Sequence, residues 1–244
     1  EIKRLELQHQ IWLSEAKTGW VSANFSKNNT ILDLGSGPGT CSRELAKIVG
    51  TGGKIISVDK SSYYIQHIEN NLQNKYPQII PICSSFEDLS LEPNSIDHMF
   101  CRWSLAWVQN PNKIISKIKN YLKTGGKMVF HEYYDWSTHQ IFPFKENIDK
   151  CIKKALKSFK ESDFEIDIGA TLPQLLYNMD FNIISTRLMP KLASPDSIEW
   201  NWPKTFYYNY FPRLVKMGYL NNSDTKEFFE DFKSLEKLHY ARIF

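Results

Sequence analysis

The segment from residue 31 to residue 39 restricts the fold of this chain more than any other. It reads Ile-Leu-Asp-Leu-Gly-Ser-Gly-Pro-Gly, a short apolar run with one carboxylate followed by three glycines spaced by one residue. The apolar run predicts a buried strand. The glycines predict a turn where the backbone approaches a ligand, because glycine takes positive φ freely and has no Cβ to collide. A helix capped by Thr40 is expected next.

The spacing of the glycines separates two classes of ligand. A dinucleotide-binding turn has the pattern G-x-G-x-x-G, with a phosphate at the helix N-terminus. Here the glycines are Gly35, Gly37 and Gly39, and Thr40 stands where the third glycine of that pattern is expected. Asp33 precedes the turn, and its carboxylate would repel a phosphate but attract a sulfonium or ammonium group. The sequence therefore favours a ligand with a positive charge and without phosphate.

Apolar runs and helical patterns alternate from residue 30 to residue 135, with short turns between them. This alternation predicts an α/β fold with a doubly wound, mostly parallel sheet. The strands expected after the glycine turn are 54–58, 79–83, 96–103, 127–133 and 181–188. A helix is expected over 111–122, and we find no candidate before Phe244 for an antiparallel strand that would close the sheet.

The two ends of the chain depart from this alternation. Residues 1–25 are expected to form a helical cover, and the aromatic-rich residues 195–240 a helical lid inserted after the last strand of the sheet. The final helix is expected to be capped by Asp224, with Glu227 three residues later. We therefore predict a single domain over residues 1–244, with its core over 30–190.

The residues at the ends of the expected strands resemble the S-adenosylmethionine site of class I methyltransferases. The resemblance rests on the glycine turn, on an acid at the end of the second strand and on a Lys-Thr-Gly-Gly turn at residues 123–126. Segments 4–12 and 202–207 are similar to a bacterial small-molecule branch distantly akin to the ubiquinone/menaquinone methyltransferases. The match covers residues 30 to 190 and implies a Rossmann-like methyltransferase fold with S-adenosylmethionine as cofactor.

The resemblance also implies which residues hold the cofactor. Asp59 lies where the family hydrogen-bonds ribose hydroxyls. Ser85 stands where family members often have an aspartate that contacts the adenine amine, and Phe86 is expected to pack on the ring. Arg102 is expected to bind a carboxylate of cofactor or substrate through its planar fork. The residues expected to contact the cofactor are Gln8, Trp12, Asp33, Gly35, Ser36, Gly37, Asp59, Lys60, Ser85, Phe86 and Arg102.

Titratable and aromatic residues follow the fifth expected strand, and ligands of open α/β sheets bind beyond the carboxyl ends of strands. His131 is our first candidate for a general base because its unperturbed pKa lies near neutrality, and Tyr134 is a second catalytic candidate. The residues expected to contact the substrate are Trp103, Glu132, Tyr133 and Tyr207. For each of these residues, core packing or solvation is the alternative interpretation.

Composition restricts the partners. The net charge is only +3, there is no arginine-rich patch, and the Asn/Asp-Pro-Pro-Tyr motif of nucleic-acid methyltransferases is absent, so no nucleic acid is expected. No apolar run is long enough to span a bilayer. The four cysteines lack C-x-x-C spacing, which predicts reduced thiols, no metal site and a cytoplasmic protein. The oligomeric state is left open.

These observations predict S-adenosylmethionine-dependent methyl transfer to a small, partly apolar molecule. Methyl transfer from a sulfonium is an in-line displacement in which the protein mainly supplies proximity, orientation and exclusion of water. A general base is needed only for a weakly acidic acceptor, so the chemistry requires no fixed set of catalytic residues. The alternatives are a nicotinamide-dependent oxidoreductase on a similar sheet and a non-catalytic cofactor-binding protein. The acceptor, and whether O, N or C is methylated, remain open.

Overall fold

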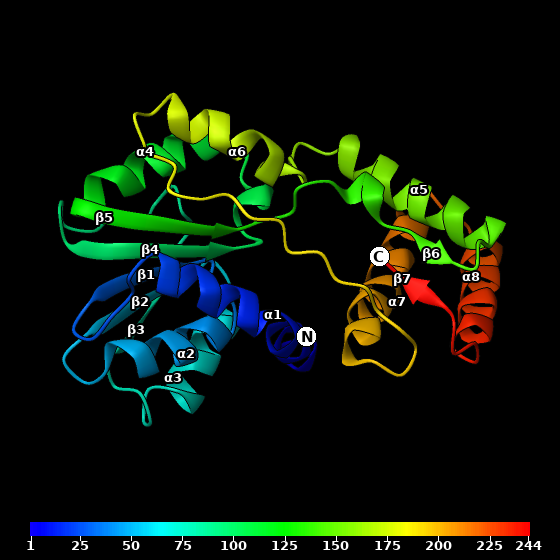
Figure 1. The fold of residues 1–244 in the computed structure, drawn as a ribbon, viewed down its shortest axis with the longest axis horizontal. Coiled ribbons are helices and arrows are strands. Elements are labelled where there is room, and N and C mark those ends of the chain that lie inside the picture. The colour runs from blue at the N-terminus through cyan, green and yellow to red at the C-terminus, as the bar shows by residue number, and fades with distance from the viewer. The chain divides into compact units, whose positions relative to one another are not determined.

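A five-stranded parallel sheet forms the centre of the cofactor-binding part of the protein, in the order β3-β2-β1-β4-β5 (Figure 1). The computed structural model describes residues 1–244. The strands are β1 (Thr30–Leu34), β2 (Lys54–Asp59), β3 (Ile79–Cys83), β4 (Ile96–Arg102) and β5 (Leu122–His131). The predicted α/β fold with a doubly wound parallel sheet is confirmed.

The contacts divide the chain into two compact units, each made of two segments. Unit 1 comprises Glu1–Tyr133 and Ile168–Ile183, and unit 2 comprises Tyr134–Asp167 and Ile184–Phe244. The core predicted over 30–190 therefore includes residues of both units, and the lid predicted over 195–240 lies within unit 2. The single domain stays a prediction.

The helices of unit 1 cover both faces of the sheet. They are α1 (Ile2–Ser22), α2 (Thr40–Val49), α3 (Ser62–Asn71), α4 (Pro111–Tyr121) and α6 (Ile168–Tyr177), with a short 3-10 turn η1 (Leu105–Trp107) after β4. Figure 1 shows α2 and α3 on one face and α4 and α6 on the other. On the first face, Trp20 of α1 packs edge-on against Phe100 of β4, with ring centroids 5.3 Å apart.

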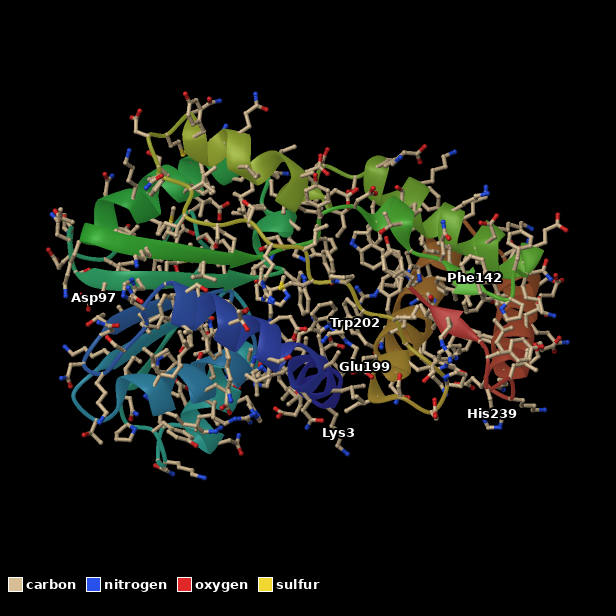
Figure 2. The ribbon with its side chains drawn as sticks, viewed as in Figure 1. Lys3, Asp97, Phe142, Glu199, Trp202 and His239 are labelled. Carbon is tan, nitrogen blue, oxygen red and sulfur yellow. The ribbon has the colours of Figure 1, made fainter.

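The amino end of the sheet is closed by polar contacts and lies away from the glycine turn. Asp97, at the start of β4, accepts a hydrogen bond from the Thr30 amide at 2.7 Å and pairs with Lys123 at 2.7 Å (Figure 2). His98 accepts a hydrogen bond from the Lys127 amide at 3.2 Å. Because the strands are parallel, all their carboxyl ends meet at the opposite edge, where the glycine turn begins.

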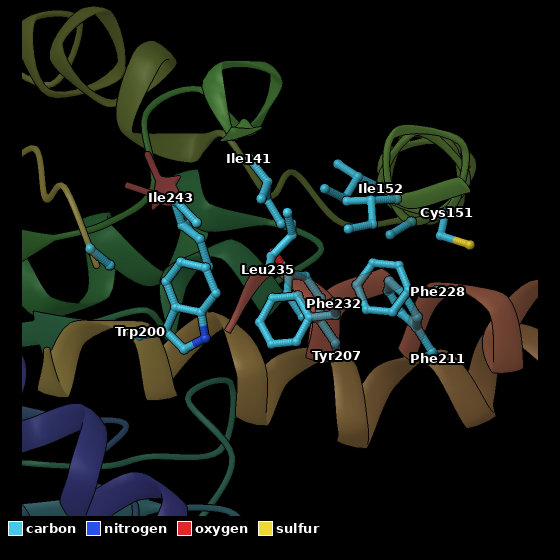
Figure 3. Packing of buried hydrophobic residues seen from close by; sticks show 14 of the residues in the cluster. Ile141, Cys151, Ile152, Trp200, Tyr207, Phe211, Phe228, Phe232, Leu235 and Ile243 are labelled. Atoms are coloured by element: carbon cyan, nitrogen blue, oxygen red, sulfur yellow. The ribbon is translucent and has the colours of Figure 1, made fainter. Parts of the chain in front are cut away.

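Unit 2 has its own aromatic core. Its elements are η2 (Trp136–Thr138), β6 (Ile141–Phe142), α5 (Glu146–Lys160), η3 (Ile198–Trp200), α7 (Asn201–Lys216), α8 (Asn222–Leu235) and β7 (Arg242–Ile243). Figure 3 shows Tyr207 and Phe211 of α7 packed with Phe228 and Phe232 of α8, and these four side chains are at most 1% exposed. Burial of large rings gives this small unit a core that needs no contribution from the sheet.

The predicted strand over 181–188 is wrong, because these residues form no strand. Their Ile and Thr content has strand propensity, but a strand needs a partner, and here Ile184 and Leu188 are 63% and 69% exposed. Near the C-terminus, β7 pairs antiparallel with β6 in a separate two-stranded sheet and does not extend the main one. The parallel sheet therefore ends at β5.

Two helix caps and one strand end also differ from expectation. Gly39 precedes α2 with φ +81°, so Thr40 is the first helical residue and does not cap the helix. The capping box of α8 is formed by Asn221 and Asp224, three residues before the expected pair. The fifth strand stops at His131, so Glu132 and Tyr133 lie just beyond it. Backbone hydrogen bonding decides such boundaries, and local sequence fixes them only to within a few residues.

Cys41, Cys101 and Cys151 are buried, Cys83 is exposed, and all four thiols are free. No helix combines the length and apolar character that crossing a membrane requires.

Candidate cofactor and active site

The glycine turn follows β1, and all three of its glycines have positive φ. Gly35 and Gly37 have φ of +77° and +54°. The amides of Gly35 and Ser36 both donate to the carbonyl of Val58 at 2.9 Å, which ties the turn to β2. A Cβ on Gly35 would lie 2.0 Å from Ser104 Oγ, whereas a Cβ on Gly37 would meet only Leu5 at 3.9 Å. The backbone is therefore packed against protein at Gly35 and open to a ligand at Gly37.

Asp59 at the end of β2 is bonded to this turn. Its Oδ2 accepts from the Gly37 amide at 2.9 Å, and its Oδ1 accepts from the Ser61 amide at 2.9 Å. Lys60 follows it and is exposed. The structure thus places Asp59 next to the open glycine. Its contact with a ligand stays a prediction.

Asp33 lies beneath the turn and is only 2% exposed. Its carboxylate accepts from Ser42 Oγ at 2.6 Å, and Ser42 in turn accepts from Ser57 Oγ at 2.8 Å. Burial raises the pKa of Asp33 to about 6, against the opposing effects of the Ser42 hydrogen bond and the Arg102 charge. The sequence reasoning missed Ser42 and Ser57, whose polar character among apolar core positions was the only signal.

Arg102 at the end of β4 meets His9 of α1. Arg102 Nη2 donates to His9 Nδ1 at 3.2 Å, which fixes the neutral ring with its proton on Nε2. Burial lowers the pKa of His9 to about 4, and the Arg102 charge acts in the same direction. Arg102 Nη1 and His9 Nε2 are both buried without a hydrogen-bond partner. The pair therefore carries two buried donors that lack an acceptor.

Aromatic rings surround the carboxyl ends of β4 and β5. Trp103 stacks on Tyr133 with centroids 5.4 Å apart, and it meets Trp12 edge-on at 5.7 Å and His131 at 4.9 Å. His131 is 3% exposed. The Arg102 guanidinium lies 5.3 Å from the centroid of the Trp103 ring. The predicted residues of α1, β4 and β5 thus come together in one cluster.

Glu132 is hydrogen-bonded within the protein. Its Oε1 accepts from the amides of Ser104 and Leu105 at 3.1 and 3.0 Å and from the Cys101 thiol at 3.5 Å. Its Oε2 is buried without a partner. Burial raises the pKa of Glu132 to about 7, and the hydrogen bonds to the Leu105 and Ser104 amides oppose this shift. The expectation that Glu132 contacts substrate is not tested.

The remaining predicted cofactor residues lie in unit 1. Phe86 lies close to Gly35, since a Cβ built there would be 3.3 Å from its ring. Ser85 Oγ accepts from the Asp88 amide at 3.1 Å and donates to its carboxylate at 2.7 Å. Gln8 is buried on α1 and accepts from Arg4 at 3.2 Å. Ser104, which the sequence reasoning missed, fills the space that Gly35 leaves free.

Two predicted residues belong to unit 2. Tyr134 is 54% exposed. Tyr207 is 1% exposed, and its hydroxyl lies 2.6 Å from His139 Nε2. Because His139 Nδ1 donates to the Phe244 carbonyl at 2.9 Å, Nε2 is the acceptor and Tyr207 the donor. Burial lowers the pKa of His139 to about 4. Their predicted roles at the active site are not tested.

The comparisons with known proteins concern the family and the fold of the chain. A family model described as a methyltransferase domain matches residues 25–179. An uncharacterized transposon protein of Streptomyces fradiae is 24% identical over 81% of this chain, which spans 58% of that relative's length. The ubiquinone/menaquinone biosynthesis C-methyltransferase UbiE of Francisella tularensis is 25% identical over 74% of this chain and 76% of its own length.

A solved structure shares the fold. It is a protein from Bacillus halodurans assigned to the methyltransferases, with TM-score 0.59 at 14% identity over 79% of this chain and 78% of that one. The matched family model and the methyltransferase relatives identify the chain as a class I S-adenosylmethionine-dependent methyltransferase. The chain belongs to the family of the matched methyltransferase domain.

Proposed function

We propose that this enzyme transfers a methyl group from S-adenosylmethionine to a small, partly apolar acceptor by in-line displacement. The observation that carries the proposal is the turn at Gly37, open in front and flanked by the Asp59 carboxylate. The aromatic wall of Trp12, Trp103 and Tyr133 supports an apolar acceptor. A relative named for quinone biosynthesis agrees with this choice.

The cofactor supplies an activated methyl group on a good leaving group. In our proposal Asp59 accepts hydrogen bonds from the ribose hydroxyls, and the backbone at Gly37 lies along the ligand. Phe86, beside Gly35, packs against the adenine, while the Asp33 carboxylate beneath the turn favours a cationic ligand. Oriented in this way, the two reactants need little further assistance, because proximity and exclusion of water provide much of the rate enhancement of such a displacement.

The methionine end of the cofactor has a candidate partner in Arg102 and His9. A buried donor without an acceptor costs about 1–3 kcal/mol, and a carboxylate would satisfy such donors with charge-assisted bonds. No carboxylate of the protein pairs with Arg102, so we assign this role to the carboxylate of the cofactor. The acceptor's own carboxylate is the second possible source of the same group.

The catalytic roles of His131 and Tyr134 stay predictions. His131 lies among aromatic rings at the end of β5, where a base for a phenolic or enolic acceptor would be expected. An amine acceptor that is already neutral would need no such base, so the effect of His131→Asn on turnover separates the two acceptor classes.

Calorimetry with S-adenosylmethionine, NADH and buffer alone tests the proposal first. We expect binding of the methyl donor and none of NADH; the reverse result would favour an oxidoreductase. Transfer of a labelled methyl group to a panel of small phenols, quinols, amines and carboxylic acids then tests the acceptor class. A protein that binds the donor and methylates no small acceptor, even in cell extract, would support the non-catalytic alternative.

The assignment of Arg102 is tested with two product analogues. S-adenosylhomocysteine carries the amino-acid end, and 5′-methylthioadenosine lacks it. We expect Arg102→Met to weaken binding of the first by about tenfold or more and to leave the second unchanged. Equal losses for both would mean that Arg102 is structural, and no loss for either would transfer its role to the acceptor's carboxylate.

A further inference from the structure

Glu132 connects β5 to the loop that follows β4. A single oxygen of its carboxylate accepts from two consecutive backbone amides, Ser104 at 3.1 Å and Leu105 at 3.0 Å. The Cys101 thiol on β4 donates to the same oxygen at 3.5 Å. These donors all lie between residues 101 and 105, so one side chain fixes the whole turn that leaves β4.

The turn held by Glu132 packs directly on the glycine turn. Ser104 Oγ donates to the carbonyls of Gly35 and Arg102, at 3.3 and 3.1 Å. The Ser104 side chain occupies the position where any side chain on Gly35 would lie, since a Cβ built there falls 2.4 Å from Ser104 Cβ. A displacement of Ser104 therefore changes the support of the first glycine in the cofactor turn.

The same turn contains a strained residue. Trp103 has φ +49°, in the left-handed region that bulky side chains rarely adopt. Strain of this kind persists only where the surroundings determine the backbone. Here Trp103 is held on both sides, because its own amide donates to the His131 carbonyl at 3.0 Å and the next two amides donate to Glu132.

We propose that Glu132 is a positioning residue for cofactor binding, which holds the Trp103–Leu105 turn against Gly35 and thereby fixes the glycine turn. It acts through Ser104 and does not touch the reacting atoms. The role differs from the substrate contact expected from the sequence, and it holds whichever acceptor the enzyme uses. It also gives the carboxylate that follows β5 a role within the protein.

The proposal has a consequence for pH. A protonated carboxyl accepts weaker hydrogen bonds than a carboxylate, so the turn is held less firmly at low pH. If the fixed turn favours the cofactor, reciprocity requires that the cofactor favours the ionised form of Glu132. Burial places the pKa of Glu132 near 7 in the cofactor-free protein, so affinity should rise with pH through this value.

Other titratable groups near Glu132 do not produce the same rise. Burial raises the pKa of both Cys101 and Tyr133, so these groups stay neutral around pH 7. Asp33 titrates at about 6, so the rise that its ionisation produces lies one unit below that of Glu132 and is retained in Glu132→Gln. The ligand's own α-amino group is the same in every measurement, so its titration cancels when variants are compared.

The experiment measures the Kd of S-adenosylhomocysteine from pH 5.5 to 8.5 for the full chain and for Glu132→Gln. Glutamine keeps an oxygen for the two amides but cannot ionise. We expect the variant to bind about tenfold more weakly at pH 8, because neutral bonds are roughly half as strong, and to lose the rise centred near pH 7. His98→Gln is the control, since it alters a buried contact between β4 and β5 at the opposite end of the sheet.

Loss of affinity with an unchanged pH profile would mean that Glu132 is merely structural and would overturn the proposal, as would a Kd within twofold of the wild-type value. A double-mutant cycle adds a second test. Trp103→Gly removes the strain, so Glu132→Gln should then cost clearly less affinity, whereas additive losses would contradict the proposal. If Glu132→Gln does not fold, the Kd of 5′-methylthioadenosine, which has no α-amino group, is measured against pH for Asp33→Asn: a rise near pH 7 supports the proposal, and a flat profile overturns it.

Discussion

Replacing Gly37 by alanine adds one methyl group at the place where the cofactor is expected to meet the backbone. Gly37 has φ +54°, and its Cβ would find only Leu5, at 3.9 Å. Gly125, at the other end of the sheet, offers a matched control, because it has φ +80° and open space around its Cβ. Both substitutions impose the same kind of backbone strain, but only one of them obstructs the proposed site.

The two variants should lose similar stability. Alanine in the left-handed region costs about 1–2 kcal/mol. The reduced freedom of the unfolded chain offsets about 0.4–1 kcal/mol of this. The net loss is about 1 kcal/mol, which lowers Tm by about 2–4 °C in a chain of this size. For binding, we expect the new methyl group to separate ligand and backbone in Gly37→Ala and to weaken affinity about 100-fold, or about 2.7 kcal/mol. Gly125→Ala should bind normally.

Thermal melts and calorimetry with S-adenosylmethionine measure the two effects separately. The reasoning predicts matched Tm values and widely different Kd values. It would be refuted if Gly37→Ala bound the cofactor as tightly as Gly125→Ala, because the turn would then be a structural feature that no ligand approaches. Gly37→Val, with a branched side chain, should weaken binding further.

Three further predictions concern other residues. Asp59→Ala removes two proposed charge-assisted bonds of about 1.5–3 kcal/mol each, so calorimetry should show affinity lower by one to several decades; an unchanged Kd would exclude Asp59 from the site. Burial raises the pKa of Asp33 from 3.8 to about 6, so its contribution to stability is complete below pH 3.8 and is lost as pH rises through 6. At pH 8 the free energy of unfolding of Asp33→Asn should therefore exceed that of wild type by up to about 3 kcal/mol, and its melting temperature should be higher. The variant should nevertheless bind the cofactor more weakly. Equal melting temperatures at pH 8 would contradict the prediction. Tyr207→Phe leaves His139 Nε2 without its donor, so the free energy of unfolding should fall by about 1–3 kcal/mol and Tm should fall with it. Cofactor affinity should stay unchanged, and a loss of affinity would give Tyr207 a role at the active site.

The sequence was sufficient for features that depend on local pattern. The runs ending at Asp59 and Arg102 are mostly apolar and are buried on both faces, as is typical of parallel strands between helices, and they form β2 and β4. The glycine turn could be predicted from the sequence because the backbone angles of such a turn require glycine. Signals of this kind lie within a few residues and need no knowledge of the rest of the fold.

The features that were missed depend on contacts between distant segments. Ser104 matters because Gly35 has no side chain, and the two are 69 positions apart. The bond between Arg102 and His9 spans 93 positions. The segment 181–188 has the residue types of a strand, yet whether it forms one depends on a partner edge that its own sequence does not specify. Contacts between residues far apart in the sequence therefore could not be predicted from the sequence alone.

The sheet order also affects how readily two copies of the protein can associate. Because β5 is the last strand of the parallel sheet, the backbone groups on its outer side have no neighbouring strand within the sheet. Such an edge is a template on which another chain can add, and charged side chains along it are a common defence. Lys123 and Lys127 stand at the beginning of β5. Asp97 neutralises Lys123 in an ion pair, so the charge that we expect to repel a second copy is that of Lys127. We therefore expect replacement of Lys127 by an apolar residue to promote self-association along this edge.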